Sequence, residues 1–270
     1  MPVSSPLYIV SGATGGIGGA VAEALARQGK PLVLACRNMK AAAKKVEQLT
    51  DATGNTDIQA LMLDLGSFDA VRHFVEEVKR LERPVAALVN VAGAMSRDSS
   101  LTADGYELDI QVNCLSTALL ARLLAPMIPS GGHIIFTSSV TRKIWNLPDV
   151  FPHEPHFSQL GTYGRSKLAL TIFAHHFAAQ VKAQGIRVAC ADPGVVNTGM
   201  ISMHRWFDFL ADIFFRPFIS SPAQGARPML AALSDEDTCL MHCGNSSRPL
   251  VMRQRWEAAK PSVLAAIPER

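Results

Sequence analysis

Residues 7–18 read LYIVSGATGGIG, and this stretch decides what the rest of the chain can be. A short apolar run from Leu7 to Val10 passes directly into a glycine-rich turn, and an Ala-rich helical pattern then begins at Gly19 and stops at Gly29. A strand, a glycine-rich turn and a helix in this order let backbone N–H groups and a helix N-terminus hold a pyrophosphate. A glycine-rich turn without a ligand is the alternative reading of this stretch alone.

Composition excludes several classes of protein. The chain has 270 residues, of which 48% are hydrophobic and 18% charged, so it is not a mainly disordered chain. This length suits one α/β domain over residues 1–270. The net charge of +3 is small and the basic residues are scattered, so no nucleic-acid partner is expected.

The cysteines and the hydropathy pattern indicate a reduced, cytoplasmic protein. Five cysteines are an odd number, and the chain opens without a signal-peptide pattern. Metal binding is not expected, because Cys239, His242 and Cys243 lack a nearby partner pair, and His153 and His156 lie in a Pro-rich loop. No apolar run reaches the roughly 18 residues that span a bilayer.

Strand-like and helical patterns alternate along the chain. Strands are predicted near residues 7–10, 32–35, 58–63, 85–89, 133–139 and 186–191, and helices near 19–28, 39–50, 67–81, 102–127 and 163–181. This alternation predicts a doubly wound parallel sheet in a three-layer α/β/α arrangement. From Ser234 onward we expect one more strand and an irregular tail.

Tyr163 and Lys167 are the first candidates for chemistry. They lie one turn apart on the same face of the predicted helix. A free phenol titrates near ~10, and a nearby ammonium lowers that pKa. Such a Tyr can exchange a proton with a carbonyl or alcohol oxygen. An exposed helix turn is the alternative for this pair taken alone.

The end of the second strand bears on the choice of cofactor. In nucleotide-binding α/β folds an Asp or Glu there accepts a hydrogen bond from the ribose 2′-hydroxyl of NAD. This chain has Cys36-Arg37-Asn38 instead. A guanidinium can bind a 2′-phosphate through paired hydrogen bonds, so NADP is favoured over NAD. A solvated Arg at the start of the next helix is the alternative.

Several motifs together resemble the short-chain dehydrogenase/reductase family over about residues 5–200. The motifs are the Gly-x-x-x-Gly-x-Gly turn after Ser11, Asn90-Val91-Ala92-Gly93, Asn113, Ser139, the Tyr163/Lys167 pair and the Pro193–Thr198 segment. Ser11 replaces the usual Thr, and Val91 replaces the second Asn of Asn-Asn-Ala-Gly, so one hydrogen bond of the central sheet is expected to be missing. The long gap between Ser139 and Tyr163, and Ala-Cys-Arg-Asn after the second strand, resemble the branch of retinol dehydrogenases and carbonyl reductases.

The resemblance implies a Rossmann fold and a role for each matched residue. Tyr163 would be the acid/base, Ser139 rather than Ser138 would bind the substrate oxygen, and Asn113 would complete a proton relay through a water held against Lys167. Lys167 would lower the Tyr163 pKa and hold the nicotinamide ribose. Cofactor contacts are expected from Gly12, Thr14, Gly15, Gly16, Ile17, Gly18, Arg37, Asn38, Asp64, Leu65, Asn90, Ala92, Gly93, Tyr163, Lys167, Pro193, Gly194, Val196 and Thr198. Asp64 has two equal readings, one at the adenine amino group and one as a cap for the helix near Ser67.

The predicted function is that of an NADP-dependent oxidoreductase that interconverts a carbonyl and an alcohol on a small, lipophilic substrate. An aromatic helix at about residues 206–218, within a segment 199–220, is expected to be a substrate lid, with a subunit contact or a membrane contact as alternatives. Family habit implies a homo-oligomer, either a dimer or a tetramer. A non-catalytic NADP-binding scaffold or regulator, or an epimerase or dehydratase of the same fold, are the alternative functions.

Overall fold

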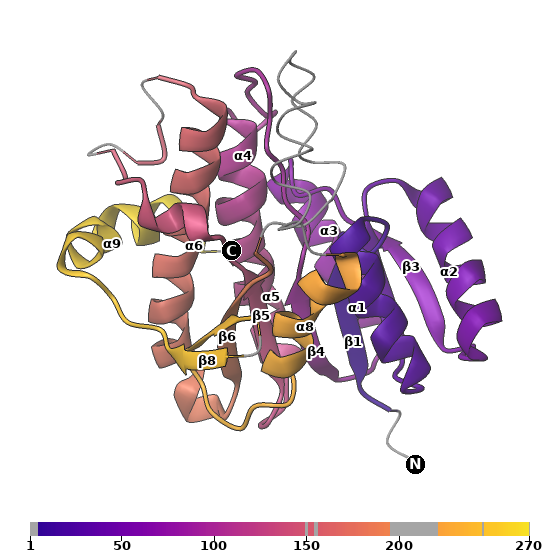
Figure 1. Ribbon diagram of the computed structural model, residues 1–270. Coiled ribbons are helices and arrows are strands. Elements are labelled where there is room, and N and C mark those ends of the chain that lie inside the picture. The colour runs from indigo at the N-terminus through magenta and orange to yellow at the C-terminus, as the bar shows by residue number, and fades with distance from the viewer. Residues whose placement is uncertain (1–4, 149–150, 154–155, 195–220, 245, 270) are drawn as a thin grey trace.

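Seven parallel strands and one antiparallel strand form a single sheet in the order β3-β2-β1-β4-β5-β6-β7-β8 (Figure 1). The structure is a computed structural model that describes residues 5–148, 151–153, 156–194, 221–244 and 246–269. The strands are β1 (Leu7–Ser11), β2 (Leu32–Cys36), β3 (Ile58–Met62), β4 (Val85–Asn90), β5 (His133–Thr137), β6 (Arg187–Asp192), β7 (Leu240–Cys243) and β8 (Ser246–Pro249). The strand order reverses beside β1, and ligands of such sheets bind at that switch point, beyond the carboxyl ends of the strands.

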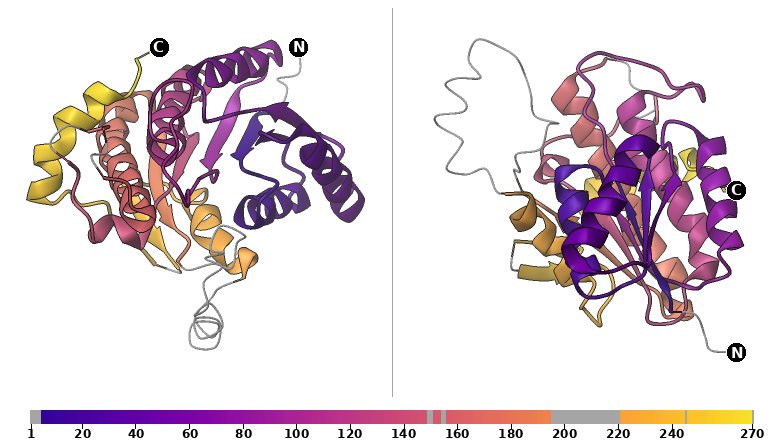
Figure 2. Two further views of the ribbon diagram at one scale, coloured as in Figure 1. Left: turned by 90° about the horizontal axis from the view of Figure 1, so that it is seen from above. Right: turned by 90° about the vertical axis from the view of Figure 1, so that its right-hand side faces the viewer.

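Helices cover both faces of the sheet and produce three layers (Figure 2). On one face lie α1 (Gly16–Arg27), α2 (Met39–Thr53) and α8 (Pro222–Ala232). On the other lie α3 (Phe68–Arg80), the continuous helical segment of α4 (Leu108–Ile110), η1 (Gln111–Leu115), α5 (Ser116–Leu124) and η2 (Ala125–Met127), and then α6 (Gln159–Val181) with α9 (Gln254–Ala266) against it. The short segments η3 (Val140–Lys143) and η4 (Lys182–Gln184) flank α6. The predicted doubly wound, three-layer architecture is confirmed.

The turn between β1 and α1 shows why glycine is needed there. Gly12 has a φ of +68°, and a Cβ on it would lie 2.9 Å from the backbone of Ala92 after β4. A Cβ on Gly18 would lie 2.3 Å from the carbonyl oxygen of Gly12. Any side chain at these two positions would push the turn away from the sheet, so the two glycines keep the N-terminus of α1 close to the strand ends.

Two sequence predictions of secondary structure are wrong. The long helix begins at Leu108 rather than near Thr102, because Leu101 pairs with Glu107 in an isolated bridge and the Glu107 carboxylate caps the helix by accepting from the Asp109 and Ile110 amides. The C-terminal region holds two strands and the helix α9 instead of one strand and an irregular tail. Pro261 inside α9 weakened its helical pattern in the sequence.

The segment Leu108–Met127 is long and apolar enough to cross a membrane by length and composition, which the sequence reading did not anticipate. In the fold 83% of its most apolar window is buried inside the protein. It packs between α3 and α6, and its apolar side chains belong to the main core. Its apolar composition is therefore that of a helix buried in the core of the protein.

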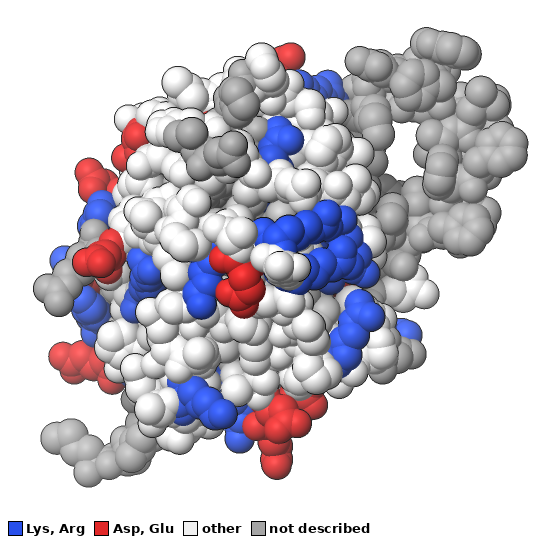
Figure 3. Space-filling model, turned by 90° about the vertical axis from the view of Figure 1, so that its left-hand side faces the viewer, with Lys and Arg blue, Asp and Glu red and all other residues white. Residues whose placement is uncertain are grey.

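Charged side chains are distributed unevenly over the face shown in Figure 3. Uncharged side chains form most of that face, basic and acidic groups are scattered among them, and the largest basic group lies to the right of its centre. Mixed charges of this kind agree with the small net charge of +3.

Candidate active site

The carboxyl ends of β4, β5 and β6 meet the first turns of α6, and this junction brings the candidate catalytic residues together. Tyr163 and Lys167 lie one turn apart on α6, with the Lys167 Nζ 5.7 Å from the centre of the Tyr163 ring. Ser139, just past β5, hydrogen-bonds the Tyr163 side chain. The three groups predicted from sequence to act together therefore do lie together.

The Tyr163 phenol is less acidic than the sequence reading expected. Burial raises its pKa to about 12, the hydrogen bond with Ser139 opposes that rise, and the Asp192 and Asp109 carboxylates add to it. Tyr163 keeps part of its surface exposed, so it is the desolvation around the ring and hydroxyl, rather than complete enclosure, that produces the effect. The expectation of a lowered Tyr163 pKa is wrong for this structure, because desolvation outweighs every other influence on the phenol.

Lys167 is a buried cation held by one carbonyl. Its side chain is buried, its Nζ donates to the Thr137 carbonyl oxygen at 3.0 Å, and burial lowers its pKa to about 8. The Asp109 and Asp192 carboxylates oppose that fall. With this pKa the group is still mostly charged at neutral pH.

Asn113 is buried in the core beside Lys167 and does not lie on the helix surface. Its amide is fully used, since Nδ2 donates to the Ala94 carbonyl at 2.8 Å and to the Ser166 Oγ at 2.9 Å, while Oδ1 accepts from the Ala94 amide. It sits in the π-helical turn η1, a distortion that is frequent at functional sites. A Cβ on Gly93 would lie 3.0 Å from Asn113 Oδ1 and 3.5 Å from Lys167 Nζ, so a side chain there would crowd the point where these groups converge.

The two serines after β5 have different surroundings. Ser138 is buried and its hydroxyl shares a hydrogen bond with the Thr171 hydroxyl on α6 at 2.9 Å. The Ser139 Oγ accepts hydrogen bonds from the Thr141 amide and hydroxyl, and it is hydrogen-bonded to Tyr163. Only Ser139 therefore faces the phenol.

The glycine-rich turn fits a bound diphosphate. Thr14, Gly15 and Gly16 are exposed at its tip, and the first turn of α1 has neither a side-chain cap nor an acidic residue. The first N–H groups of that helix are therefore available to an anion. Ile17 and Gly18 follow inside the first helical turn. The Ser11 hydroxyl, in place of the family Thr, accepts from the Val91 and Ala92 amides at 3.1 Å and joins this turn to the end of β4.

Asn90, which precedes Val91, holds the end of β4. Its Nδ2 donates to the Ile135 carbonyl at 3.3 Å, and its carbonyl accepts from the Thr137 hydroxyl at 2.6 Å. Its Oδ1 is buried with no hydrogen-bond partner among the described residues. The strand end is thus held, with one acceptor left unused.

The residues expected around the adenosine lie at the ends of β2 and β3. Arg37 is exposed, while Asn38 accepts from the Ala41 amide at 3.0 Å and caps α2. Asp64 accepts from the Gly66 amide at 2.9 Å, and Leu65 after it is buried. Ser67 caps α3, so the alternative that Asp64 caps this helix is wrong.

Pro193 and Gly194 follow β6, and Gly194 has a φ of +72°. The Gly194 amide donates to the Asp192 Oδ1 at 3.1 Å. Val196, Thr198, the predicted lid at 199–220 and its aromatic helix lie outside the described residues.

Sequence reasoning missed an ion pair beneath this site. Arg142 and Asp192 are both buried and lie 2.9 Å apart. The only signals were an Arg shortly after the strand-end serines and an Asp directly before Pro-Gly. Their contact depends on the pairing of β5 with β6, which neither signal shows.

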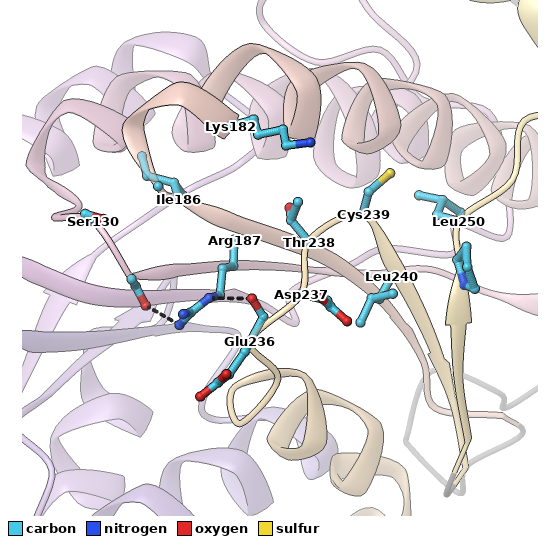
Figure 4. A pocket seen from close by; sticks show the side chains of 13 residues that line it. Ser130, Lys182, Ile186, Arg187, Glu236, Asp237, Thr238, Cys239, Leu240 and Leu250 are labelled. Atoms are coloured by element: carbon cyan, nitrogen blue, oxygen red, sulfur yellow. Dashed lines mark hydrogen bonds between the residues drawn. The ribbon is translucent and has the colours of Figure 1, made fainter.

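Two other features lie apart from this site. Among the described residues no group of three His, Cys, Asp or Glu side chains could hold a metal ion. A cavity of about 790 Å³ lies at the opposite, amino-terminal end of β5, β6 and β7 (Figure 4). There the Arg187 side chain donates to the Glu236 and Gly131 carbonyls. The conserved chemistry of doubly wound folds lies at the other end of the strands, so this cavity is not the candidate active site.

Comparison with known proteins gives consistent matches. A family model described as short chain dehydrogenase matches residues 7–206. Human polyprenol dehydrogenase is 33% identical over 219 residues, which cover 78% of this chain and 66% of that protein. Human retinol dehydrogenase 11 is 31% identical over 230 residues, covering 83% of this chain and 71% of that protein.

Solved structures show the same fold. A short-chain dehydrogenase from Sphingobium yanoikuyae in complex with NADPH gives a TM-score of 0.68 at 23% identity, covering 97% of this chain and 96% of that chain. L-Sorbose reductase from Gluconobacter frateurii, complexed with NADPH and L-sorbose, gives 0.69 at 23% identity, covering 90% and 96%.

Proposed function

Because the chain belongs to the short-chain dehydrogenase family, we propose that it is an NADP-dependent oxidoreductase that interconverts a carbonyl and an alcohol. The observation that carries this proposal is the Tyr163 phenol, hydrogen-bonded to Ser139 and one turn from Lys167. The test is NADPH consumption by the purified protein against a panel of ketones and aldehydes, beside direct measurement of NADPH binding. Binding without turnover on any carbonyl would favour a non-catalytic NADP-binding protein.

The residues have complementary roles in carbonyl reduction. NADPH supplies the hydride when it is bound. Tyr163 gives its proton to the oxygen that becomes the alcohol, and Ser139 hydrogen-bonds the same oxygen as charge develops on it. Lys167 places a positive charge beside the phenol and is expected to hold the nicotinamide ribose. Asn113 fixes the Ala94 backbone and Ser166 around the Lys167 amine.

The exposed turn tip and the uncapped start of α1 support the cofactor part of this proposal. Their N–H groups would hold the diphosphate, and Arg37 would meet the 2′-phosphate. Relatives named for NADPH complexes point the same way.

A lipophilic substrate is proposed from the segment between Ser139 and Tyr163. Large apolar side chains are exposed there, with Val140 at 46%, Ile144 at 63% and Leu160 at 51%. Exposed apolar groups beside a site favour an apolar ligand. Two relatives are named for polyprenol and retinol, both of them lipids.

Arg37→Asp is expected to reduce the preference for NADPH over NADH by about 10- to 100-fold. Hydrogen bonds to a charged group contribute about 1.5–3 kcal/mol, and the new carboxylate would also repel the 2′-phosphate. The measurement is Kd for each cofactor. Arg248→Asp makes the same charge change on the exposed strand β8, at the far edge of the sheet, and should leave both values unchanged. An equal loss of NADH and NADPH affinity would contradict the role of Arg37.

Ser139→Ala and Ser138→Ala should separate the two serines. Ser139→Ala removes a donor from the reacting oxygen, and we expect kcat to fall by about 10²–10³-fold. Ser138→Ala removes only the buried bond to Thr171, so it should lower the free energy of unfolding by about 1–2 kcal/mol with little change in kcat. Steady-state kinetics and thermal unfolding of both variants check the pair. A larger kcat loss in Ser138→Ala would reverse the assignment.

A further inference from the structure

We propose that Arg142 and Asp192 are a positioning pair, a buried ion bridge that holds the Ser139 segment and the Pro193-Gly194 turn in register and balances the charge beside Tyr163. This inference rests on the proposed function, because it concerns the same reacting centre.

One arginine nitrogen makes the bridge. The Arg142 Nη1 donates to the Asp192 Oδ2 at 2.9 Å and to the Ser139 carbonyl oxygen at 2.6 Å. The other carboxylate oxygen of Asp192 accepts from the Gly194 amide at 3.1 Å. The Arg142 and Asp192 side chains are only 3% and 9% exposed. A continuous chain of polar contacts therefore runs from the serine segment to the Pro-Gly turn.

The bridge begins where the sheet ends. The last residue pair of β5 and β6 is Thr137 with Ala191, and the Ser138 amide makes one further bond to the Ala191 carbonyl at 2.8 Å. Beyond that point no sheet hydrogen bonds among the described residues join the two segments. The Arg142–Asp192 ion pair therefore joins the two segments beyond the end of the sheet, where Ser139 faces Tyr163.

The pair also carries charge next to the phenol. The Asp192 carboxylate raises the pKa of Tyr163, as does Asp109 from α4, while Ser139 lowers it. Lys167, on the same helix as Tyr163, lies with its Nζ 5.7 Å from the centre of the Tyr163 ring. The Cys114 and Cys190 thiols that face Lys167 have pKa values of about 12 and stay neutral. The Arg142 guanidinium is the cation in direct contact with the Asp192 carboxylate, at 2.9 Å.

Stability alone does not explain the pair. Buried ion pairs can often be replaced by apolar residues without loss of stability. The Arg142 Nε is buried with no hydrogen-bond partner among the described residues, which is a further cost. Because the pair contacts both segments beside the phenol, it fits a role in positioning.

The test uses ionisation of Tyr163, which can be read without turnover. The chain has three tyrosines, so phenolate absorbance of each variant is compared with that of the same variant carrying Tyr163→Phe. Asp192→Asn removes the anion and leaves the Arg142 cation, so the Tyr163 pKa should fall by about one pH unit. Arg142→Gln leaves Asp192 unbalanced, so the pKa should rise by a similar amount. The double variant should return toward the wild-type value.

Opposite shifts in the two single variants support the proposal, and shifts of the same sign, or none, overturn it. If Arg142→Gln does not fold, Arg142→Lys keeps the charge and should keep the wild-type Tyr163 pKa, and a changed value there would also overturn the proposal. Arg83→Gln breaks a remote ion pair with Asp57 and should leave the Tyr163 pKa unchanged. A wild-type protein that never turns over would defeat the proposed function while leaving these titrations readable.

Discussion

Tyr163→Phe is expected to lower kcat/KM for carbonyl reduction by about 10²–10⁴-fold, the usual contribution of a positioned acid or base. The change removes one oxygen atom and keeps the ring that packs beside Lys167. The glycine-rich turn that is proposed to hold the diphosphate opens α1, whereas Tyr163 lies on α6, so the Kd for NADPH should stay within about a factor of three of wild type. Kinetics and cofactor binding of the same preparation measure both quantities.

The pKa of Tyr163 sets the expected pH dependence. A pKa of about 12 keeps the phenol protonated at neutral pH, the form that donates a proton in reduction. The ionisation of Tyr163 should therefore leave kcat/KM for reduction nearly independent of pH around neutrality. This value should fall only in strongly alkaline solution. Alcohol oxidation needs the phenolate, so its rate should rise with pH. Profiles of kcat/KM in both directions test this.

Tyr106→Phe is the matched control, because it makes the same chemical change at a ring packed edge-on against Phe68. It should leave kcat/KM unchanged. Wild-type activity in Tyr163→Phe would overturn the proposed role of the phenol.

The parts of the fold that could be predicted from sequence are those decided locally. Gly12 and Gly18 are required by a positive φ and by a contact within the same turn, and such requirements appear directly as residue type and spacing. The strands buried on both faces appear as continuous apolar runs, as in β2 and β4. The proximity of Ser139, Tyr163 and Lys167 then follows, because strand ends and a helix start meet at one edge of the sheet.

What could not be predicted depends on contacts between distant segments. Arg142 and Asp192 are 50 residues apart, and only the pairing of β5 and β6 joins them. The direction of the Tyr163 pKa shift depends on how much water the surrounding fold removes, which helical spacing does not reveal. The end of the chain is held by Arg122, which donates to the Ile267 and Pro268 carbonyls, a contact with no local signal.

Lys167→Met is expected to reduce kcat by at least about a hundredfold and to stabilise the protein at the same time. Loss of activity follows from removing the charge beside the phenol. Stabilisation follows because burial lowers the Lys167 pKa from 10.5 to about 8, which corresponds to a cost of about 3 kcal/mol for holding the charged form. Loss of the bond to the Thr137 carbonyl offsets about 1 kcal/mol of that gain. Thermal unfolding should show a Tm higher by a few degrees.

The pH dependence of this gain identifies its cause. Below the folded-state pKa of about 8 both the folded and the unfolded wild type carry the charge, so the full cost is present. As pH rises from about 8 toward the ordinary lysine pKa of 10.5, the unfolded state binds more protons than the folded state, and wild-type stability increases. The advantage of Lys167→Met should therefore be largest at neutral pH and shrink in alkaline solution. Lys182→Met, at an exposed lysine just past the end of α6, should change neither kcat nor this pH dependence. If Lys167→Met were less stable than wild type at neutral pH, the contacts of the ammonium would stabilise the fold by more than its burial costs, and the prediction would be wrong.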